Sequence, residues 1–176
     1  RFPIRWVWKE PLKNLVTEKK NPRSARIDRL STIQVLKIIN TEDRRVPLAV
    51  AKKLPQIARA GELYYQTYKN SGRIFYVGAG TSGRLGVLDA SELPPTFGAD
   101  YRRIKGIISG GYGTLTRSRE GVEDDAKAAV QDLKQEQLSK NDLVIGISAS
   151  RRTPYVVAAL SYSRKMKAKA VFISAN

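Results

Sequence analysis

Residues 73–98 read RIFYVGAGTSGRLGVLDASELPPTFG. Four apolar residues at positions 74–77 predict a buried strand over residues 73–77. Glycines and hydroxyl-bearing residues follow directly at positions 78–83, and a helix is predicted over residues 82–92. A strand that ends in glycines and opens a helix is a common anion site, because free backbone N–H groups and the helix dipole both favour a phosphate. The stretch therefore predicts both an α/β fold and an anionic ligand.

The same alternation of strand and helix continues to the end of the chain. Short apolar runs predict strands over residues 104–109, 142–148 and 170–174, separated by predicted helices over 121–138 and 152–167. Alternating units form right-handed crossovers, so we expect a doubly wound parallel sheet between two layers of helices. Ligands of such sheets bind beyond the carboxyl ends of the strands. Polar turns are expected at that edge over residues 78–83, 109–111 and 148–153.

The N-terminal part of the chain has a different pattern. Ser31 and Gln34 have the spacing of a capping box and predict the start of a short helix. A second helical stretch is predicted from about residue 42 to 69, with an apolar face and with Pro55 at a position that should kink or split it. We therefore divide the chain into an atypical leader (1–12), an N-terminal helical segment (13–70) and an α/β domain (71–176).

The composition excludes several kinds of chemistry. The 176 residues include no cysteine and no histidine. Disulfides, thiolate metal sites, cysteine nucleophiles and histidine bases are therefore excluded. Acid–base chemistry must use carboxylates, lysine or tyrosine, and we expect neither a metal nor another cofactor.

The net charge of +16 raises the possibility of nucleic-acid binding. No zinc-finger spacing, basic leucine zipper or aromatic RNA-binding signature accompanies this charge, so we do not expect nucleic acid as a partner. No apolar run is long enough to span a bilayer, and residues 1–11 lack the apolar core of a signal peptide. We expect a cytoplasmic protein with no membrane partner.

The turn over residues 78–83 resembles two nucleotide-binding patterns only in part. It begins Gly-x-Gly, but the acidic residue expected at the end of the second strand of a dinucleotide fold is missing, and no Gly-Lys-Ser/Thr follows. We select four residues as candidate phosphate ligands: Gly80, Thr81, Ser82 and Gly83. The alternative is a plain tight turn between a strand and a helix.

A second hydroxyl-rich turn follows the third predicted strand. Its candidate ligands are Ser148, Ser150 and Thr153, and Pro154 is suited to the first turn of the next helix. Two such turns at neighbouring strands could hold one sugar phosphate. The alternative is that Ser150 or Thr153 caps the helix.

Two glutamates lie at positions that the helix pattern alone can explain. Glu92 ends a predicted helix ahead of Pro94, and Glu123 lies in an acidic stretch where a helix is predicted to begin. A surface role is the default for Glu92, and the helix dipole alone accounts for acidic residues in a first turn. Spacing would select neither residue as catalytic.

Several long motifs, however, are specific. The chain contains IDRLSTIQVLKIIN, EDRRVPLAV, LPQIA, GAGTSGRLGVLDASELPPTFG, EGVEDDA and RTPYV. From about residue 15 to 176 it resembles the N-acetylmuramic acid 6-phosphate etherases, which belong to the sugar isomerase (SIS) domain family. The resemblance implies a three-layer, flavodoxin-like SIS fold that binds phosphosugars. It also implies a metal-free lyase that cleaves a D-lactyl ether by elimination and hydration, in bacterial cell-wall amino-sugar recycling.

The resemblance assigns roles to the selected residues. It implies that Glu92 is the proton donor and Glu123 the base, and that the two hydroxyl turns bind the phosphorylated amino sugar. A helix over residues 82–92 would place Glu92 about 15 Å from its phosphate-binding start, too far for one sugar to touch both. Either Gly86 breaks this helix, or Glu92 serves the site of a partner subunit. We favour the second alternative, a homodimer with a shared active site.

The sequence departs from the family in three ways. Arg151 replaces a glycine of the third turn, where a positive φ or a close approach to ligand is common. Family members continue beyond residue 176, so we expect an incomplete domain, with its C-terminal part missing and a bare sheet edge. Residues 1–11 match nothing in the family. The alternatives are therefore a non-catalytic phosphosugar-binding module, an inactive truncated fragment or, more remotely, a nucleic-acid-binding regulator.

Overall fold

The computed structural model describes residues 16–175, so the leader predicted over residues 1–12 lies outside the described part of the chain. Four parallel strands form one sheet in the order β2-β1-β3-β4. Their bounds are Ile74–Gly78 (β1), Ile104–Ile108 (β2), Leu143–Ile147 (β3) and Lys169–Ile173 (β4). Every strand lies within two residues of its predicted bounds. The doubly wound α/β fold is confirmed.

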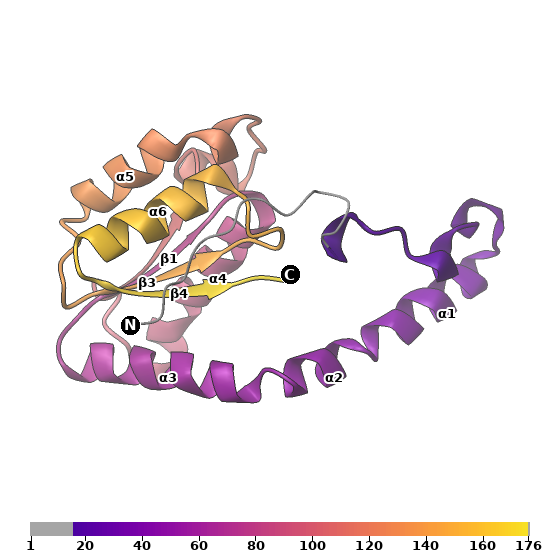
Figure 1. Cartoon of the computed structure of the whole chain (residues 1–176), viewed down its shortest axis with the longest axis horizontal. Helices are drawn as coiled ribbons and strands as arrows, with labels where there is room; N and C mark the ends of the chain where they lie inside the picture. The colour runs from indigo at the N-terminus through magenta and orange to yellow at the C-terminus, as the bar shows by residue number, and fades with distance from the viewer. Residues whose placement is uncertain (1–15, 176) are drawn as a thin grey trace.

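Helices cover both faces of the sheet (Figure 1). Phe75 and Val77 face one side, where they pack with α5 (Ala126–Gln135) and α6 (Pro154–Lys165). Ile74 faces the other side, and α3 (Leu54–Lys69) and α4 (Gly80–Phe97) contribute to the core there. Both faces of β1 are therefore buried, as its unbroken apolar sequence predicts.

Helix α4 is longer than predicted. It begins at Gly80 rather than residue 82 and continues through Pro94 and Pro95 to Phe97. Gly98 ends it in the left-handed conformation, and the Gly98 N–H donates to the Pro94 carbonyl at 2.9 Å. The two prolines each remove a backbone N–H but fall in the last turns, where this capping contact secures the helix end.

Helix α5 is shorter than the predicted span 121–138. Residues Val122–Asp124 form a separate 3-10 turn, η6, and the α-helix begins only after Asp125. The Asp125 carboxylate accepts the N–H groups of Lys127 and Ala128 at 3.0 and 2.8 Å. Asp125 is thus the N-cap of α5. Glu123 consequently lies in a 3-10 turn rather than in the first turn of an α-helix.

The N-terminal segment forms three α-helices, of which α3 packs against the sheet while α2 and α1 extend away from it (Figure 1). These are α1 (Thr32–Asp43), α2 (Val46–Ala51) and α3. The predicted capping box is present, because the Ser31 N–H donates to the Gln34 side chain at 2.8 Å. Pro55 lies in the first turn of α3, so the helical stretch is split at that proline as expected. No residue of α1 or α2 is buried in the described structure.

Candidate functional site

A cavity of about 330 Å³ lies at the carboxyl edge of the sheet. It collects residues from the turns after β1, β2 and β3 and from the segment before α5, as expected for a doubly wound sheet. The lining residues are Ala79, Gly80, Arg84, Ser109, Thr114, Ser118, Arg119, Glu120, Val122, Glu123 and Thr153.

The turn after β1 delivers the start of α4 to this cavity. Gly80 has a φ of +54°, a conformation that glycine adopts without strain. Gly83 is buried, and a Cβ there would lie 2.7 Å from the Gly78 carbonyl oxygen. Gly83 therefore permits close packing beneath the turn. Thr81 and Ser82 occupy the first turn of α4, whose backbone N–H groups have no acceptor within the helix.

The turn after β3 presents two hydroxyls together. The hydroxyls of Ser148 and Thr153 lie 2.8 Å apart, and Ser148 is buried. Thr153 is the N-cap residue of α6 but makes no side-chain capping bond, and its side chain lines the cavity. Ser150 instead accepts the Arg152 N–H at 3.2 Å within the turn. Of the three candidate ligands in this turn, only Thr153 lines the cavity.

Glu123 lines the cavity, together with Glu120, Gly80 and Thr153. The residue before Glu123 is held in place, because the buried Ser109 hydroxyl donates to the Val122 carbonyl. The structure therefore brings Glu123 to the same space as the start of α4 and the Thr153 hydroxyl. A ligand with a phosphate at one end could reach all three.

Glu92 does not line the cavity. Helix α4 is continuous, so Gly86 does not break it, and Glu92 lies more than three turns from Gly80, or about 18 Å along the axis. Its side chain is exposed and, by helical spacing, shares a face of α4 with Leu85 and Leu88. Within one copy of the chain, the two selected glutamates are therefore apart.

Five lining residues carry polar groups that the sequence analysis did not select: Arg84, Thr114, Ser118, Arg119 and Glu120. Ser109 was noted only as part of a turn. Arg84 donates to the Leu115 carbonyl at 2.9 Å and to the Thr114 carbonyl at 2.6 Å. These pairings depend on the path of the β2–α5 loop, which local patterns do not specify. The available signal in the sequence was an arginine one turn into a helix that begins at the candidate phosphate-binding turn.

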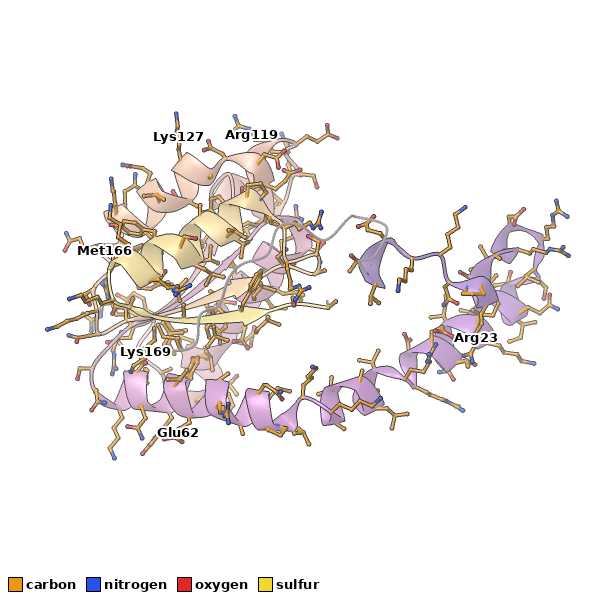
Figure 2. All side chains as sticks on the ribbon, in the orientation of Figure 1. Arg23, Glu62, Arg119, Lys127, Met166 and Lys169 are labelled. Atoms are coloured by element: carbon orange, nitrogen blue, oxygen red, sulfur yellow. The ribbon has the colours of Figure 1, made fainter. Side chains whose placement is uncertain are left out.

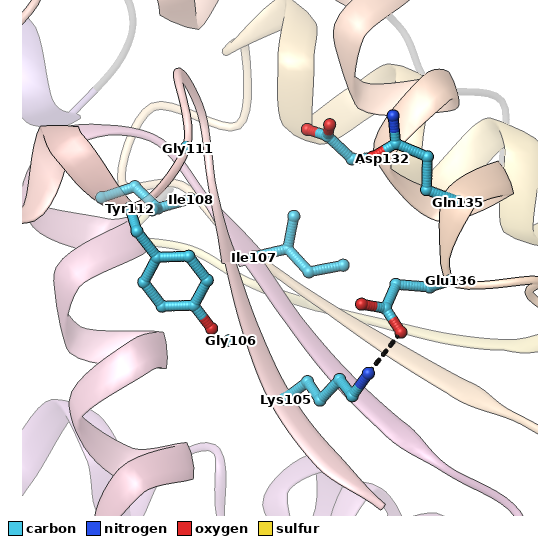
Figure 3. A pocket seen from close by; sticks show the side chains of 9 residues that line it. All are labelled: Lys105, Gly106, Ile107, Ile108, Gly111, Tyr112, Asp132, Gln135 and Glu136. Carbon is cyan, nitrogen blue, oxygen red and sulfur yellow. Dashed lines mark hydrogen bonds and ion pairs between the residues drawn. The ribbon is translucent and has the colours of Figure 1, made fainter. Parts of the chain in front are cut away.

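The described chain has a further cavity, distinct from the candidate site. A second cavity of about 210 Å³ lies beside β2, where Lys105 and Glu136 form an ion pair of 2.7 Å (Figure 3). It contains none of the predicted site residues. Residues 16–175 contain no group of three or more acidic side chains placed to hold a metal ion. None of the helices in this range is long and apolar enough to cross a membrane.

Basic side chains are distributed over several parts of the molecule. Arg23, Lys127 and Lys169 lie near α1, on α5 and on β4 respectively (Figure 2). Part of this charge is used internally, since the Lys169 ammonium donates to the Thr67 hydroxyl at 3.1 Å.

Comparison with known proteins agrees with this architecture. The glucokinase regulatory protein N-terminal SIS domain family matches residues 56–164. An N-acetylmuramic acid 6-phosphate etherase from Glaesserella parasuis is 51% identical over 165 residues, which are 94% of this chain and 54% of that protein. The Clostridium botulinum etherase is 49% identical, over 94% of this chain and 55% of its own length. The chain thus spans about half the length of these curated relatives.

Solved structures show the same fold. The phosphoheptose isomerase from Neisseria gonorrhoeae superposes with a TM-score of 0.61 at 17% identity, covering 80% of this chain and 73% of that one. The Francisella tularensis phosphoheptose isomerase gives a TM-score of 0.57 at 18% identity, covering 79% and 74%. The parallel sheet, the cavity beyond its carboxyl edge and these matches lead to one conclusion: the chain belongs to the SIS domain family and is similar, over most of its length, to N-acetylmuramic acid 6-phosphate etherases.

Proposed function

We propose that this chain carries out the reaction of N-acetylmuramic acid 6-phosphate etherases, yielding N-acetylglucosamine 6-phosphate and D-lactate. One observation carries the proposal. The start of α4, the Thr153 side chain and the Glu123 carboxylate meet in one cavity. The names of the relatives supply the substrate. The reaction would serve cell-wall amino-sugar recycling in the bacterial cytoplasm.

The proposed chemistry needs one base and one acid. In the open-chain sugar the C2 proton lies next to the C1 aldehyde, so a carboxylate can remove it. Glu123 takes this proton, the bond between C3 and the lactyl oxygen breaks, and Glu92 donates a proton to the departing lactate. Water then adds its oxygen to C3 of the unsaturated aldehyde while C2 regains a proton. No cofactor takes part in these steps.

The binding of the sugar phosphate follows from the turns. Phosphate oxygens would accept the free N–H groups at Gly80, Thr81 and Ser82, where the helix dipole also favours negative charge. Hydroxyls from the second turn would complete the site from the opposite side. Thr153 contacts the phosphate directly, and Ser148 orients the Thr153 hydroxyl through their 2.8 Å contact.

The position of Glu92 requires a second copy of the chain. Glu92 lies about 18 Å from the start of its own helix, too far from the cavity for one hexose phosphate to bridge. It shares an exposed helix face with Leu85 and Leu88, each 56% exposed. A second copy that covers these leucines would bring Glu92 into the interface. We therefore propose a homodimer with shared active sites.

D-lactate release from N-acetylmuramic acid 6-phosphate tests the proposed function. The parent chain is expected to release lactate, and Glu123→Gln to lower kcat by at least about 100-fold with little change in KM. Glu120→Gln serves as a comparison within the same cavity, and Glu62→Gln as a control on the outer side of α3. Failure of the parent chain to release lactate would contradict the proposal.

A second candidate function is a phosphosugar-binding module without catalysis. The family that matches residues 56–164 is named for a regulatory protein, and this favours a binding role. Such a module would bind N-acetylglucosamine 6-phosphate in a calorimeter but release no lactate. Lactate release and calorimetric binding of N-acetylglucosamine 6-phosphate together therefore separate the two functions.

A further inference from the structure

The loop formed by residues 109–123, which is most of the connection between β2 and α5, carries one side of the cavity. Its outer part, residues 116–121, is exposed, and Arg119 is labelled at the rim of the molecule in Figure 2. The inner end of the loop leads directly to Glu123. Because exposed loops are mobile unless they are tied down, the contacts that hold this loop determine where Glu123 lies.

Arg84 of α4 forms the first attachment. Its guanidinium donates to the carbonyls of Thr114 and Leu115, at 2.6 and 2.9 Å, and to the Ser118 hydroxyl at 3.4 Å. The two carbonyls end the 3-10 turn η5 (Tyr112–Leu115), where no further helical N–H is available to them. The planar guanidinium fork can reach both at once, which a lysine ammonium cannot do with the same geometry.

Ser109, at the end of β2, forms the second attachment. Its side chain is buried and donates to the Val122 carbonyl, in the peptide bond that precedes Glu123. Its N–H donates to the Gly78 carbonyl at 3.0 Å, in the turn that leads to α4. Ser109 therefore connects the proposed phosphate-binding turn to the segment that carries the proposed base.

We propose that Arg84 and Ser109 are positioning residues that hold the 109–123 loop so that Glu123 faces the turn after β1 across the cavity. The inference rests on the proposed function, in which Glu123 must meet a C2 proton of a sugar whose phosphate is fixed at α4. A small displacement of a catalytic group strongly lowers the rate, because the reacting atoms must be held at near-contact distance. Substrate affinity depends mainly on the helix start and is largely retained.

Two conservative substitutions test the two attachments separately. Arg84→Lys keeps the charge but loses the fork, and Arg117→Lys is its matched control on an exposed position of the same loop. Ser109→Ala removes the hydroxyl that holds Val122. Its control is Ser163→Ala, which removes an equally buried hydroxyl that donates to Ala159 within α6.

Hydrogen exchange of the amides over residues 112–123 gives the first readout. Each test substitution is expected to raise exchange of these amides about tenfold, the effect of losing one or two hydrogen bonds, while the controls leave it unchanged. Unchanged exchange in both test variants would overturn the proposal.

Lactate release gives the second readout. Arg84→Lys and Ser109→Ala are expected to lower kcat about tenfold or more, with KM changed less than about threefold. Faster loop exchange with an unchanged kcat would overturn the positioning role. If the parent chain releases no lactate, the proposed function fails, and N-acetylglucosamine 6-phosphate becomes the probe. Protection of amides 122–124 by this sugar in the parent but not in the test variants supports the inference, and equal or absent protection contradicts it.

Discussion

Arg151 adopts the left-handed region of backbone space in the turn after β3, with a φ of 62°. Its N–H donates to the Ser148 carbonyl at 3.2 Å, so the strained residue closes the turn that carries the proposed phosphate-binding hydroxyls. A side chain with a Cβ is destabilised in this conformation by about 1–2 kcal/mol relative to the right-handed region. The strain expected from the arginine at this position is therefore present in the structure.

Arg151→Gly is expected to raise the free energy of unfolding by about 0.5–1 kcal/mol, because relief of strain exceeds the added entropy of the unfolded chain. Urea denaturation of the two proteins measures the difference. Arg152→Gly is the matched control: Arg152 has no positive φ, so glycine there should destabilise the protein. Equal shifts for the two variants would show that backbone strain is not the cause.

Only part of the candidate site could be predicted from local sequence. Gly80 and Thr153 could be identified because each follows a buried strand and begins a helix, a pattern that local residues specify. Glu123 was selected through family resemblance, because the acidic residues around it do not distinguish it in the local sequence. Arg84 was missed because its acceptors are carbonyls about thirty residues away, and only the folded loop brings them within reach.

A buried carboxylate joins the amino ends of β1 and β3. Asp142 accepts the Arg73 backbone N–H at 2.9 Å, the Arg73 guanidinium at 2.8 Å and the Ser139 N–H at 2.8 Å. Arg73 also donates to the carbonyls of Glu136 and Gln137 after α5. Burial opposes ionisation of Asp142, but the hydrogen bonds from Arg73 and Ser139 outweigh it and lower the pKa of this carboxyl.

Asp142→Asn is expected to lower the free energy of unfolding at pH 7 by about 3 kcal/mol, because Arg73 loses its charged partner in a buried network. The lowered pKa makes this stabilisation available above the ordinary carboxyl pKa of about 4, and it is lost as the pH falls further. Denaturation between pH 7 and pH 3 should therefore show the parent and variant converging in acid. Asp28→Asn, at an exposed pair with Arg29, should have little effect at any pH. A difference for Asp142→Asn that did not decrease between pH 7 and pH 3 would exclude the ionised carboxylate as its source.

The elements themselves were easier to predict than their ends. Strands were identifiable because apolar runs between turn residues specify buried strands directly. The end of α4 was misjudged at Pro94 and Pro95, since the Gly98 cap that stabilises the last turn outweighs two missing N–H groups. The start of α5 was misjudged because Asp125, rather than the earlier acidic residues, accepts the first free N–H groups.

The N-terminal helices of a single chain leave many large apolar side chains exposed to solvent. Large apolar side chains that are 45–66% exposed occur along α1, α2 and the start of α3: Ile33, Leu36, Ile39, Val46, Leu48, Val50, Leu54 and Ile57. Contiguous apolar surfaces on folded proteins commonly mark interaction sites. On α4, Leu85 and Leu88 are also exposed and share a helix face with Glu92. In the homodimer proposed above, a second copy would cover exposed leucines of α4 and bring Glu92 into the interface.

Shared active sites predict complementation between two inactive variants. Glu92→Gln and Glu123→Gln should each abolish most lactate release alone. In a mixed dimer, one site combines an intact Glu123 from one copy with an intact Glu92 from the other. Random re-association of an equal mixture should therefore restore about a quarter of the parent activity, since half of the dimers are mixed and each has one intact site.

The matched control mixes Glu123→Gln with Glu123→Ala, a pair in which no arrangement of copies restores the base. Size-exclusion chromatography with light scattering should find a dimer in every sample, because these substitutions leave the exposed leucines of the proposed interface unchanged. If the chain is a monomer, or if the Glu92 and Glu123 variants form mixed dimers that regain no activity, Glu92 does not act across an interface. Since α4 runs unbroken from Gly80 to Phe97, the acid would then have to come from another residue of the cavity, and Glu120 is the carboxylate that lies there.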